Sequence, residues 1–168
     1  TFVVLSAMSG TTNSLVEISN YLYKKNPDGA NEVINNLEKK YMQHVDELFT
    51  TDEYKQKTRD FLISEFGYLR SFTKDIFTSF EEKSIVAQGE IMSTNMMVNY
   101  LEEQGVKAIL LSAFDFMRTD KNAEPDAQYI KEKLTAIMND NEGYQIYITQ
   151  GFICRNAYGE VDNLQRGG

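Results

Sequence analysis

The side chains of this chain that could do chemistry are hydroxyls, carboxylates, lysines and arginines. The 168 residues include a single histidine, His44, and a single cysteine, Cys154. One histidine excludes a multi-histidine metal site, and its place in a polar helical stretch disfavours a Ser–His catalytic pair. One cysteine excludes an internal disulfide and fits a reducing compartment. Any reaction must therefore use carboxylates, hydroxyls, basic side chains and backbone groups.

The stretch from Phe2 to Val16 joins a hydroxyl-rich turn to elements that can bind an anion. Its first four residues are apolar, which indicates a strand covered on both faces, as in a parallel sheet. Nearly all residues from Ser6 to Thr12 are small or hydroxylic, and apolar residues at helical spacing follow. A strand, a glycine turn and a helix direct backbone N–H groups toward an anion. An ordinary turn capped by Thr11 or Thr12 explains the same residues, and on this stretch alone it is the simpler interpretation.

Glu90 is the carboxylate with the most unusual neighbours. It lies in a helix predicted over 84–104, directly after Gly89 and before the apolar residues Ile91 and Met92. A glycine inside a helix costs about 1 kcal/mol relative to alanine, so it usually reflects close packing. Glu90 is therefore either a solvated helix carboxylate or a carboxylate held in a cleft, and the local pattern does not choose between them.

The remaining sequence predicts the elements that position these side chains. Strands are predicted at residues 2–5, 106–112 and 144–149, and helices at about 11–25, 30–49, 51–80, 84–104 and 125–138. In the third helix, Thr50 and Glu53 are predicted to form a capping box, and Ile76 and Phe80 belong to the core-facing stripe. Residues 156–168 are predicted to be a loop or hairpin. Strands that alternate with helices indicate an α/β domain with a largely parallel sheet.

Three segments follow the carboxyl ends of the predicted strands. They are Ser6–Asn13, Phe114–Thr119 and Gln150–Phe152. Ligands of open parallel sheets bind outside these ends of the strands. We therefore expect the three segments to border one cleft.

Composition limits the classes of partner. The net charge is −8, which disfavours nucleic acid and anionic membranes as main partners. No apolar run approaches the roughly 20 residues of a membrane-spanning helix, and no signal peptide opens the sequence. These features predict a cytoplasmic protein. We find no linker or repeat, so residues 1–168 are predicted to lie within one domain.

Five segments, taken together, resemble one family. VVLSAMSGTTNSL, VAQGEIMSTNMMVNYL, MRTDKNAEPD, ITQGFI and LQRGG occur in the order found in aspartokinases of the amino-acid-kinase superfamily. The resemblance covers nearly the whole chain, is weakest over about 25–82, and is closer to the lysine-pathway type. It implies a three-layer α/β/α sandwich of the carbamate-kinase-like type, partial here, with a mostly helical excursion at about 25–83. Residues 1–168 would be the aspartate-binding portion of a single catalytic domain.

The resemblance also implies an activity and a site. Aspartokinases transfer a phosphoryl group from ATP, with Mg²⁺, to the side-chain carboxylate of L-aspartate, giving 4-phospho-L-aspartate for amino-acid biosynthesis. Ser6 matches a serine beside the transferred group. Glu90 matches the carboxylate that binds the substrate ammonium, and Arg166 the arginine that binds the α-carboxylate. The expected substrate-binding residues are Gly10, Thr12, Glu90, Gln150, Gly151, Phe152 and Arg166.

The sequence also departs from the family pattern. The motif Lys-Phe-Gly-Gly-Thr-Ser, whose lysine contacts the ATP phosphates, does not occur, and neither do the regulatory domains. We therefore expect an internal fragment of a homo-oligomeric enzyme, inactive alone, with most of the ATP and Mg²⁺ site elsewhere. The alternative is a non-catalytic small-molecule-binding or regulatory module of the same fold.

Overall fold

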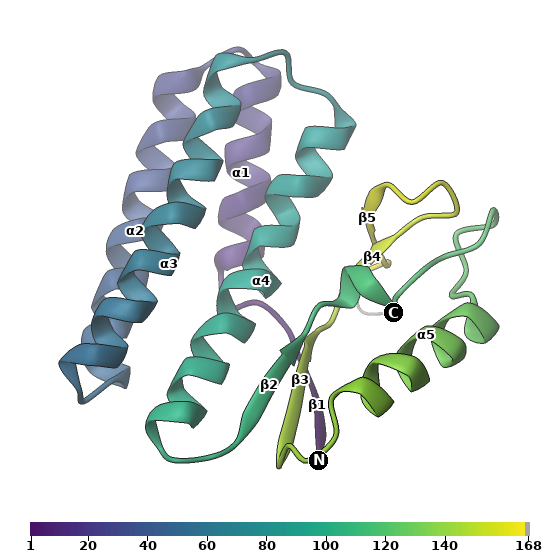
Figure 1. Cartoon of the computed structure of the whole chain (residues 1–168). Helices are drawn as coiled ribbons and strands as arrows, with labels where there is room; N and C mark the ends of the chain where they lie inside the picture. Colours follow the sequence, from purple (N-terminus) through teal and green to yellow (C-terminus); the bar gives the residue numbers. More distant parts are fainter. Residues whose placement is uncertain (167–168) are drawn as a thin grey trace.

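The computed structural model describes residues 1–166, and a parallel three-stranded sheet lies at its centre (Figure 1). The strands are β1 (Phe2–Leu5), β2 (Ala108–Leu111) and β3 (Ile146–Gln150), in the order β1-β3-β2. β3 is the central strand and is the most buried, which fits its run of β-branched and aromatic residues. The carboxyl ends of β1 and β3 therefore meet at one edge of the sheet.

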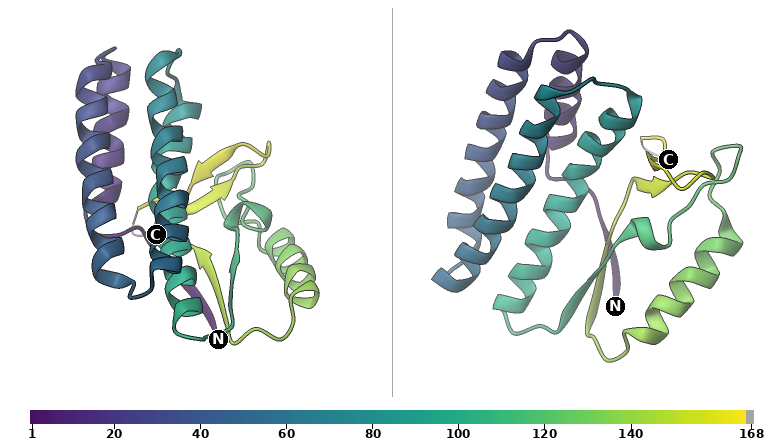
Figure 2. Two further views of the ribbon diagram at one scale, coloured as in Figure 1. Left: turned by 60° about the vertical axis from the view of Figure 1, so that its left-hand side comes forward. Right: turned by 45° about the horizontal axis from the view of Figure 1, so that its top comes forward.

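Helices cover both faces of this sheet, which confirms the predicted α/β architecture. α5 (Ala127–Asp140) packs Ile130, Leu134 and Ile137 against Leu111 and Tyr147 on one face. α4 (Ser79–Glu103) lies against the other face, as the rotated views show (Figure 2). The long helix α4 thus belongs both to the sheet layers and to the helical part of the molecule.

The predicted helical excursion forms a bundle with α1 and α4. α1 (Thr11–Tyr23), α2 (Pro27–Leu48) and α3 (Asp52–Ser71) run alongside α4 and extend beyond the sheet, and the short turn η1 (Phe72–Lys74) follows α3 (Figure 1). Each helix contributes an apolar stripe to a shared core. The largest fully buried side chains of this core are Leu15, Ile18, Ile34, Tyr41, Phe49, Leu62, Phe66, Leu69, Ile85 and Met92.

A hairpin follows β3 and is tied to α4. It consists of β4 (Ile153–Arg155) and β5 (Val161–Asn163), which pair antiparallel. Lys83 of α4 forms an ion pair with Asp162 at 3.0 Å and donates a hydrogen bond to Asn163 at 3.2 Å. The short turn η2 (Ala113–Asp115) follows β2. The hairpin is therefore positioned beside the first turns of α4.

Several predicted helix starts and caps differ from those of the structure. Gly10, with φ 81°, occupies the N-cap position of α1 and provides no side-chain cap, in place of the expected threonine. Thr51 rather than Thr50 caps α3, and the Thr50 and Thr51 N–H groups donate to Glu103 at the end of α4. The capping box of the chain lies at Thr78 and Glu81, which starts α4 at Ser79.

Two predictions of burial are also wrong. Ile76 and Phe80 are 85% and 61% exposed, because α3 ends at Ser71 and its apolar stripe does not continue. Phe2 and Val4 are 39% and 59% exposed, because these alternate residues of β1 point to the face of the strand that is less covered. The predicted two-sided burial of β1 therefore does not hold.

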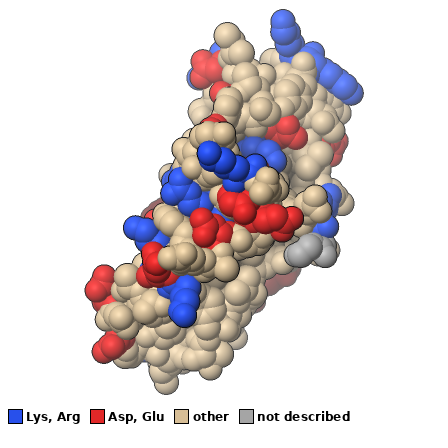
Figure 3. Space-filling model, turned by 90° about the vertical axis from the view of Figure 1, so that its right-hand side faces the viewer, with Lys and Arg blue, Asp and Glu red and all other residues tan. Residues whose placement is uncertain are grey.

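The surface mixes charges of both signs. On the face drawn in Figure 3, acidic side chains lie beside basic ones, and the basic ones do not form a continuous surface. Within residues 1–166, no helix combines the length and apolar character that crossing a membrane requires.

Candidate functional site

A polar cavity of about 390 Å³ lies where β1 and β3 end. It lies between the β1–α1 turn, α4 and the segment that follows β3. Its lining residues are Ser6, Ala7, Thr12, Glu90, Gly151, Phe152, Leu164, Gln165 and Arg166. Two of the three segments expected to border one cleft meet here, whereas Phe114–Thr119 does not line it.

The β1–α1 turn presents the start of a helix to this cavity. Gly10 adopts a left-handed φ of 81°, a conformation that glycine allows without steric cost, and α1 begins at Thr11. The first N–H groups of a helix have no acceptor within the helix and are suited to an anion. Thr12 lines the cavity, and Gly10 shapes the turn without lining it.

Two residues of α2 hold this turn in place. Lys40 donates a hydrogen bond from Nζ to the Ser9 carbonyl oxygen at 3.0 Å. The hydroxyls of Tyr41 and Thr11 are hydrogen-bonded at 2.7 Å, and both residues are fully buried. Burial raises the pKa of Tyr41 to about 12, so its hydroxyl stays protonated at neutral pH. No pattern in the sequence marked Lys40 or Tyr41, since both look like ordinary residues of an amphipathic helix.

Glu90 is buried in the wall of the cavity with one carboxylate oxygen unsatisfied. The residue is 3% exposed, which excludes the solvated alternative. Its Oε1 accepts a hydrogen bond from the Ala7 N–H at 3.3 Å, and its Oε2 has no hydrogen-bond partner among residues 1–166. Burial raises the pKa of Glu90, while the Ala7 amide and the Arg166 charge oppose that rise. A buried carboxylate oxygen without a donor indicates a site for a cationic or donating ligand group.

Gly89 permits the contact between α4 and the turn. A Cβ atom at this position would lie 2.9 Å from Ala7 Cβ and 3.3 Å from Leu15 Cδ1. Both neighbours are fixed by the backbone or by the buried core. The glycine therefore allows α4 to approach closely enough for Glu90 to accept the Ala7 amide.

Arg166 supplies a positive charge to the same cavity. Its side chain is exposed and donates from Nη2 to Asn13 Oδ1 at 3.2 Å, which ties the tail to the first turn of α1. Glu90 and Arg166 thus contribute opposite charges to one space. The two glycines after Arg166 lie outside the described residues.

The segment after β3 contributes backbone more than side chains. The Gly151 N–H donates to the Leu5 carbonyl at 2.8 Å, and Phe152 has a φ of 66°. A left-handed conformation is unfavourable for phenylalanine, and such strain concentrates at functional sites. The Phe152 carbonyl accepts from the Leu164 N–H at 2.7 Å, so the strained residue also holds the tail.

Gln150 does not line the cavity, although the sequence placed it with the substrate-binding residues. It is buried, and its amide bonds to the Ala113 N–H at 2.8 Å and to Thr94 Oγ1 at 3.2 Å. Ala7, Leu164 and Gln165 line the cavity without having been predicted. The contribution of Ala7 is a backbone N–H, which every residue except proline carries, so the sequence could not single it out.

Ser6 lies between this cavity and a larger hollow. The second hollow, of about 540 Å³, is lined mainly by apolar residues such as Met8, Met96 and Tyr100. The Ser6 carbonyl oxygen accepts a hydrogen bond from Ser93 Oγ at 2.6 Å, and this contact does not involve the Ser6 hydroxyl. We take the smaller cavity as the candidate site because the unsatisfied oxygen and both opposite charges lie there.

The arrangement fits a small zwitterion better than a metal ion. In the part of the chain that the structure describes, no three histidine, cysteine or acidic side chains lie close enough to hold a metal. These residues therefore do not fit a magnesium site of their own. A ligand with one ammonium group and more than one carboxylate would satisfy Glu90, Arg166 and the N–H groups at the start of α1.

Comparison with known proteins relates the whole chain to kinases of amino acids. The model of the amino acid kinase family matches residues 1–168. The chain is 28% identical over 170 residues to bifunctional aspartokinase/homoserine dehydrogenase 2 of Escherichia coli strain K12. It is 29% identical over 171 residues to lysine-sensitive aspartokinase 3 of the same organism. Each match covers 99% of this chain. The matched region is 20% of the length of the bifunctional enzyme and 37% of the length of aspartokinase 3.

Solved structures give the same relationship. A crystal structure of E. coli aspartokinase III in complex with aspartate and ADP matches with a TM-score of 0.78 at 28% identity. The same enzyme in complex with lysine and aspartate matches with a TM-score of 0.66 at 25% identity. Each match covers 99% of this chain and 37% of the other. An aspartate kinase of Clostridium acetobutylicum, at 16% identity and a TM-score of 0.70, shares the fold.

Proposed function

Because the chain belongs to the amino acid kinase family, we propose that it forms the aspartate-binding part of an aspartokinase. The protein would transfer a phosphoryl group from ATP to the side-chain carboxylate of L-aspartate. The observation that carries the proposal is the unsatisfied Oε2 of Glu90 in a cavity that Arg166 also lines. The related E. coli enzyme crystallised with aspartate and ADP supports the choice of ligand.

Aspartate fits the charges of the cavity group by group. Its ammonium would bind the free oxygen of Glu90, and its α-carboxylate would bind the Arg166 guanidinium. The side-chain carboxylate would then lie toward Ser6 and the N–H groups at the start of α1. Substrate ammonium at Glu90 would favour the ionised carboxylate and so reverse the effect of burial on its pKa.

Phosphoryl transfer to a carboxylate needs little acid–base chemistry from these residues. The acceptor is already ionised at neutral pH, so positioning and electrostatic stabilisation provide most of the catalysis. Arg166 is the one basic side chain that lines the cavity within residues 1–166, and the substrate would occupy it. We therefore propose that other residues of the full-length protein bind the nucleotide and its Mg²⁺. The 168-residue chain alone would bind aspartate without turning it over.

Ligand analogues and matched variants test the assignment on the full-length protein. Calorimetry would measure the Kd of L-aspartate, of succinate, which lacks the ammonium, and of β-alanine, which lacks the α-carboxylate. Glu90→Gln should lose the preference for aspartate over succinate, and Arg166→Ala the preference over β-alanine. Each charged contact is worth about 1.5–3 kcal/mol, so each preference should fall about tenfold or more.

The controls change the same residue types away from the cavity. Glu65 on α3 is half-buried, and burial raises its pKa as it does for Glu90, so Glu65→Gln should leave both preferences intact. Arg59→Ala removes a guanidinium that pairs with Asp46 on α2. Loss of selectivity in the controls, or its retention in the site variants, would contradict the assignment. Aspartate binding without aspartate-dependent ATP consumption would instead favour the non-catalytic module.

A further inference from the structure

A buried chain of hydrogen bonds runs from the end of β2 through β3 to the turn of α4 that carries Glu90. The Ala113 N–H donates to Gln150 Oε1 at 2.8 Å, and Gln150 Nε2 donates to Thr94 Oγ1 at 3.2 Å. Thr94 Oγ1 in turn donates to the Glu90 carbonyl oxygen at 2.7 Å. All four residues are 6% exposed or less. The sheet is therefore connected to the Glu90 backbone through side chains that lie outside the cavity.

The chemistry of the groups fixes the direction of every bond in this chain. A backbone N–H can only donate, so Ala113 requires the oxygen of the Gln150 amide. The nitrogen of that amide must then donate to Thr94, whose hydroxyl hydrogen is left for the carbonyls of its own helix, Glu90 at 2.7 Å and Ile91 at 3.2 Å. Glutamine at 150 and a hydroxyl at 94 are both needed, because no group in the chain can exchange its role with another.

We propose that Gln150 and Thr94 are positioning residues, which hold the Glu90 turn of α4 at its distance from the β1–α1 turn. The inference rests on the proposed function, since it assigns to Gln150 a role behind the aspartate site rather than in it. The contact that it preserves is long: the Ala7 N–H reaches Glu90 Oε1 at 3.3 Å. A small shift of α4 would break that contact and misplace the free carboxylate oxygen.

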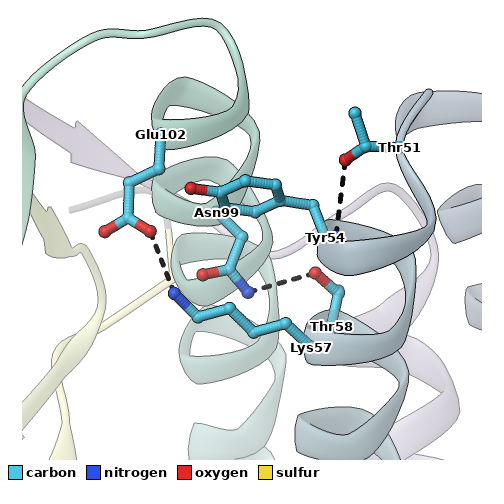
Figure 4. A network of polar contacts seen from close by, with 6 residues as sticks. All are labelled: Thr51, Tyr54, Lys57, Thr58, Asn99 and Glu102. Carbon is cyan, nitrogen blue, oxygen red and sulfur yellow. Dashed lines mark hydrogen bonds and ion pairs between the residues drawn. The ribbon is translucent and has the colours of Figure 1, made fainter.

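The same helix offers a matched control for stability. Thr58 of α3 accepts a hydrogen bond from Asn99 Nδ2 of α4 at 3.1 Å, in a buried contact (Figure 4). Thr94→Val and Thr58→Val each delete one buried hydroxyl and leave one buried amide N–H without its acceptor. Asn99 lies about 13 Å along the helix from Glu90, at about 1.5 Å per residue. Thr58→Val therefore removes a buried side-chain contact to α4 that lies farther from Glu90 than the contact removed by Thr94→Val.

The test compares these variants in the full-length protein by calorimetry and thermal melts. Both should lower the Tm to a similar extent. Thr94→Val should weaken aspartate binding about tenfold or more and lower the aspartate-to-succinate preference, since small misplacements of site groups are costly. Thr58→Val should leave both binding quantities at the wild-type level. Thr94→Ser, which restores the hydroxyl, should recover them, and Gln150→Met should resemble Thr94→Val.

A second measurement separates this inference from the proposed function. The Glu90 carboxyl would be titrated by carbon-13 NMR in each variant, without any ligand. Thr94→Val should shift that titration, and Thr58→Val should not. Failure of the wild-type protein to bind aspartate would refute the proposed function, and the titration would still decide the positioning role. An unchanged titration in Thr94→Val, or equal binding losses in both valine variants, would overturn the inference.

Discussion

Burial of the Glu90 carboxylate costs folding stability in the free protein, and that cost depends on pH. Burial raises its folded pKa above the unfolded value. The folded state therefore holds the proton more tightly, and the associated stability is present at acid pH and lost as pH rises through the folded pKa. Binding of an ammonium group would remove this cost.

Glu90→Gln should change how stability depends on pH. The variant removes the ionisable group, so its Tm relative to wild type should rise between pH 4 and pH 7. Differential scanning calorimetry at a series of pH values measures the change. Glu65→Gln should show the same direction, because burial also raises the pKa of Glu65. A wild-type advantage that grows toward neutral pH would show that Glu90 has a stabilising partner.

Gly89→Ala should affect both the fold and the site. The added methyl would lie 2.9 Å from Ala7 Cβ, which cannot move without its backbone. Overpacking of this kind costs about 1–3 kcal/mol, and relief would push α4 away from the β1–α1 turn. We expect a lower Tm and a larger aspartate Kd. Gly67→Ala, on α3 with open space around it, is the matched control and should preserve both. Wild-type aspartate affinity in Gly89→Ala would contradict the close-approach argument.

At the residue scale, the sequence predicted several of the residues that line the cavity. The family motifs brought Glu90, Arg166 and Phe152 to one cavity. Gln150 contacts Thr94 of α4, and alternation along a strand cannot predict this contact without the partner helix. The contact of the Ala7 amide with Glu90 could not be predicted either, because it depends on the close approach of α4.

At the element scale, Glu103 joins the end of α4 to the start of α3. Its carboxylate accepts from the N–H and hydroxyl groups of both Thr50 and Thr51, at distances between 2.8 and 3.4 Å. These hydrogen bonds lower the pKa of Glu103, although partial desolvation opposes them. The carboxylate therefore serves as a cap for α3 that comes from another helix.

Glu103→Gln should destabilise the protein at neutral pH. A group with a lowered folded pKa contributes stability above its unfolded pKa and loses it as pH falls through the folded value. On acidification, the Tm of Glu103→Gln relative to wild type should therefore rise, whereas that of Glu90→Gln should fall. Glu102→Gln, which removes the neighbouring ion pair with Lys57, serves as a control with a smaller expected effect. A difference that does not depend on pH would refute the capping role.

The helix termini show why element boundaries were harder to predict than elements. The periodic apolar residues indicated four helices before β2, and the structure has them. One start also involves a partner far away in the sequence, since Glu103 accepts from the Thr51 N–H at the start of α3. The capping box at Thr78 and Glu81 is a local sequence pattern. It was not predicted, because the third helix was expected to continue to Phe80.

At the scale of the whole molecule, the helical layers differ in how completely their apolar side chains are buried. The helical bundle has a continuous buried core, whereas α5 has no fully buried residue and packs through half-buried ones. Local opening free energy follows the amount of buried apolar contact. Hydrogen exchange followed by mass spectrometry should therefore show faster exchange in α5 than in α2. Equal protection of the two helices would contradict this difference.

The α/β class was predictable from the alternation of strands and helices, and the layered architecture from the family resemblance. Strand and helix patterns predicted a parallel sheet covered on both faces, and the family resemblance placed the helical excursion. The exposure of Val4 on β1 was not predictable, because burial of a strand depends on which elements cover it and not on its own residues.

The contacts of Lys40 and Tyr41 with the β1–α1 turn have a consequence for protein engineering. Both residues lie on α2, outside the five segments that carry the family resemblance, yet they contact the backbone turn that opens onto the cavity. Exchange of the α2–α3 segment between relatives is therefore not a neutral swap of a surface module. A chimaera needs an amine and a phenol at these two positions, or the recipient turn loses its supports even though every cavity-lining residue is native.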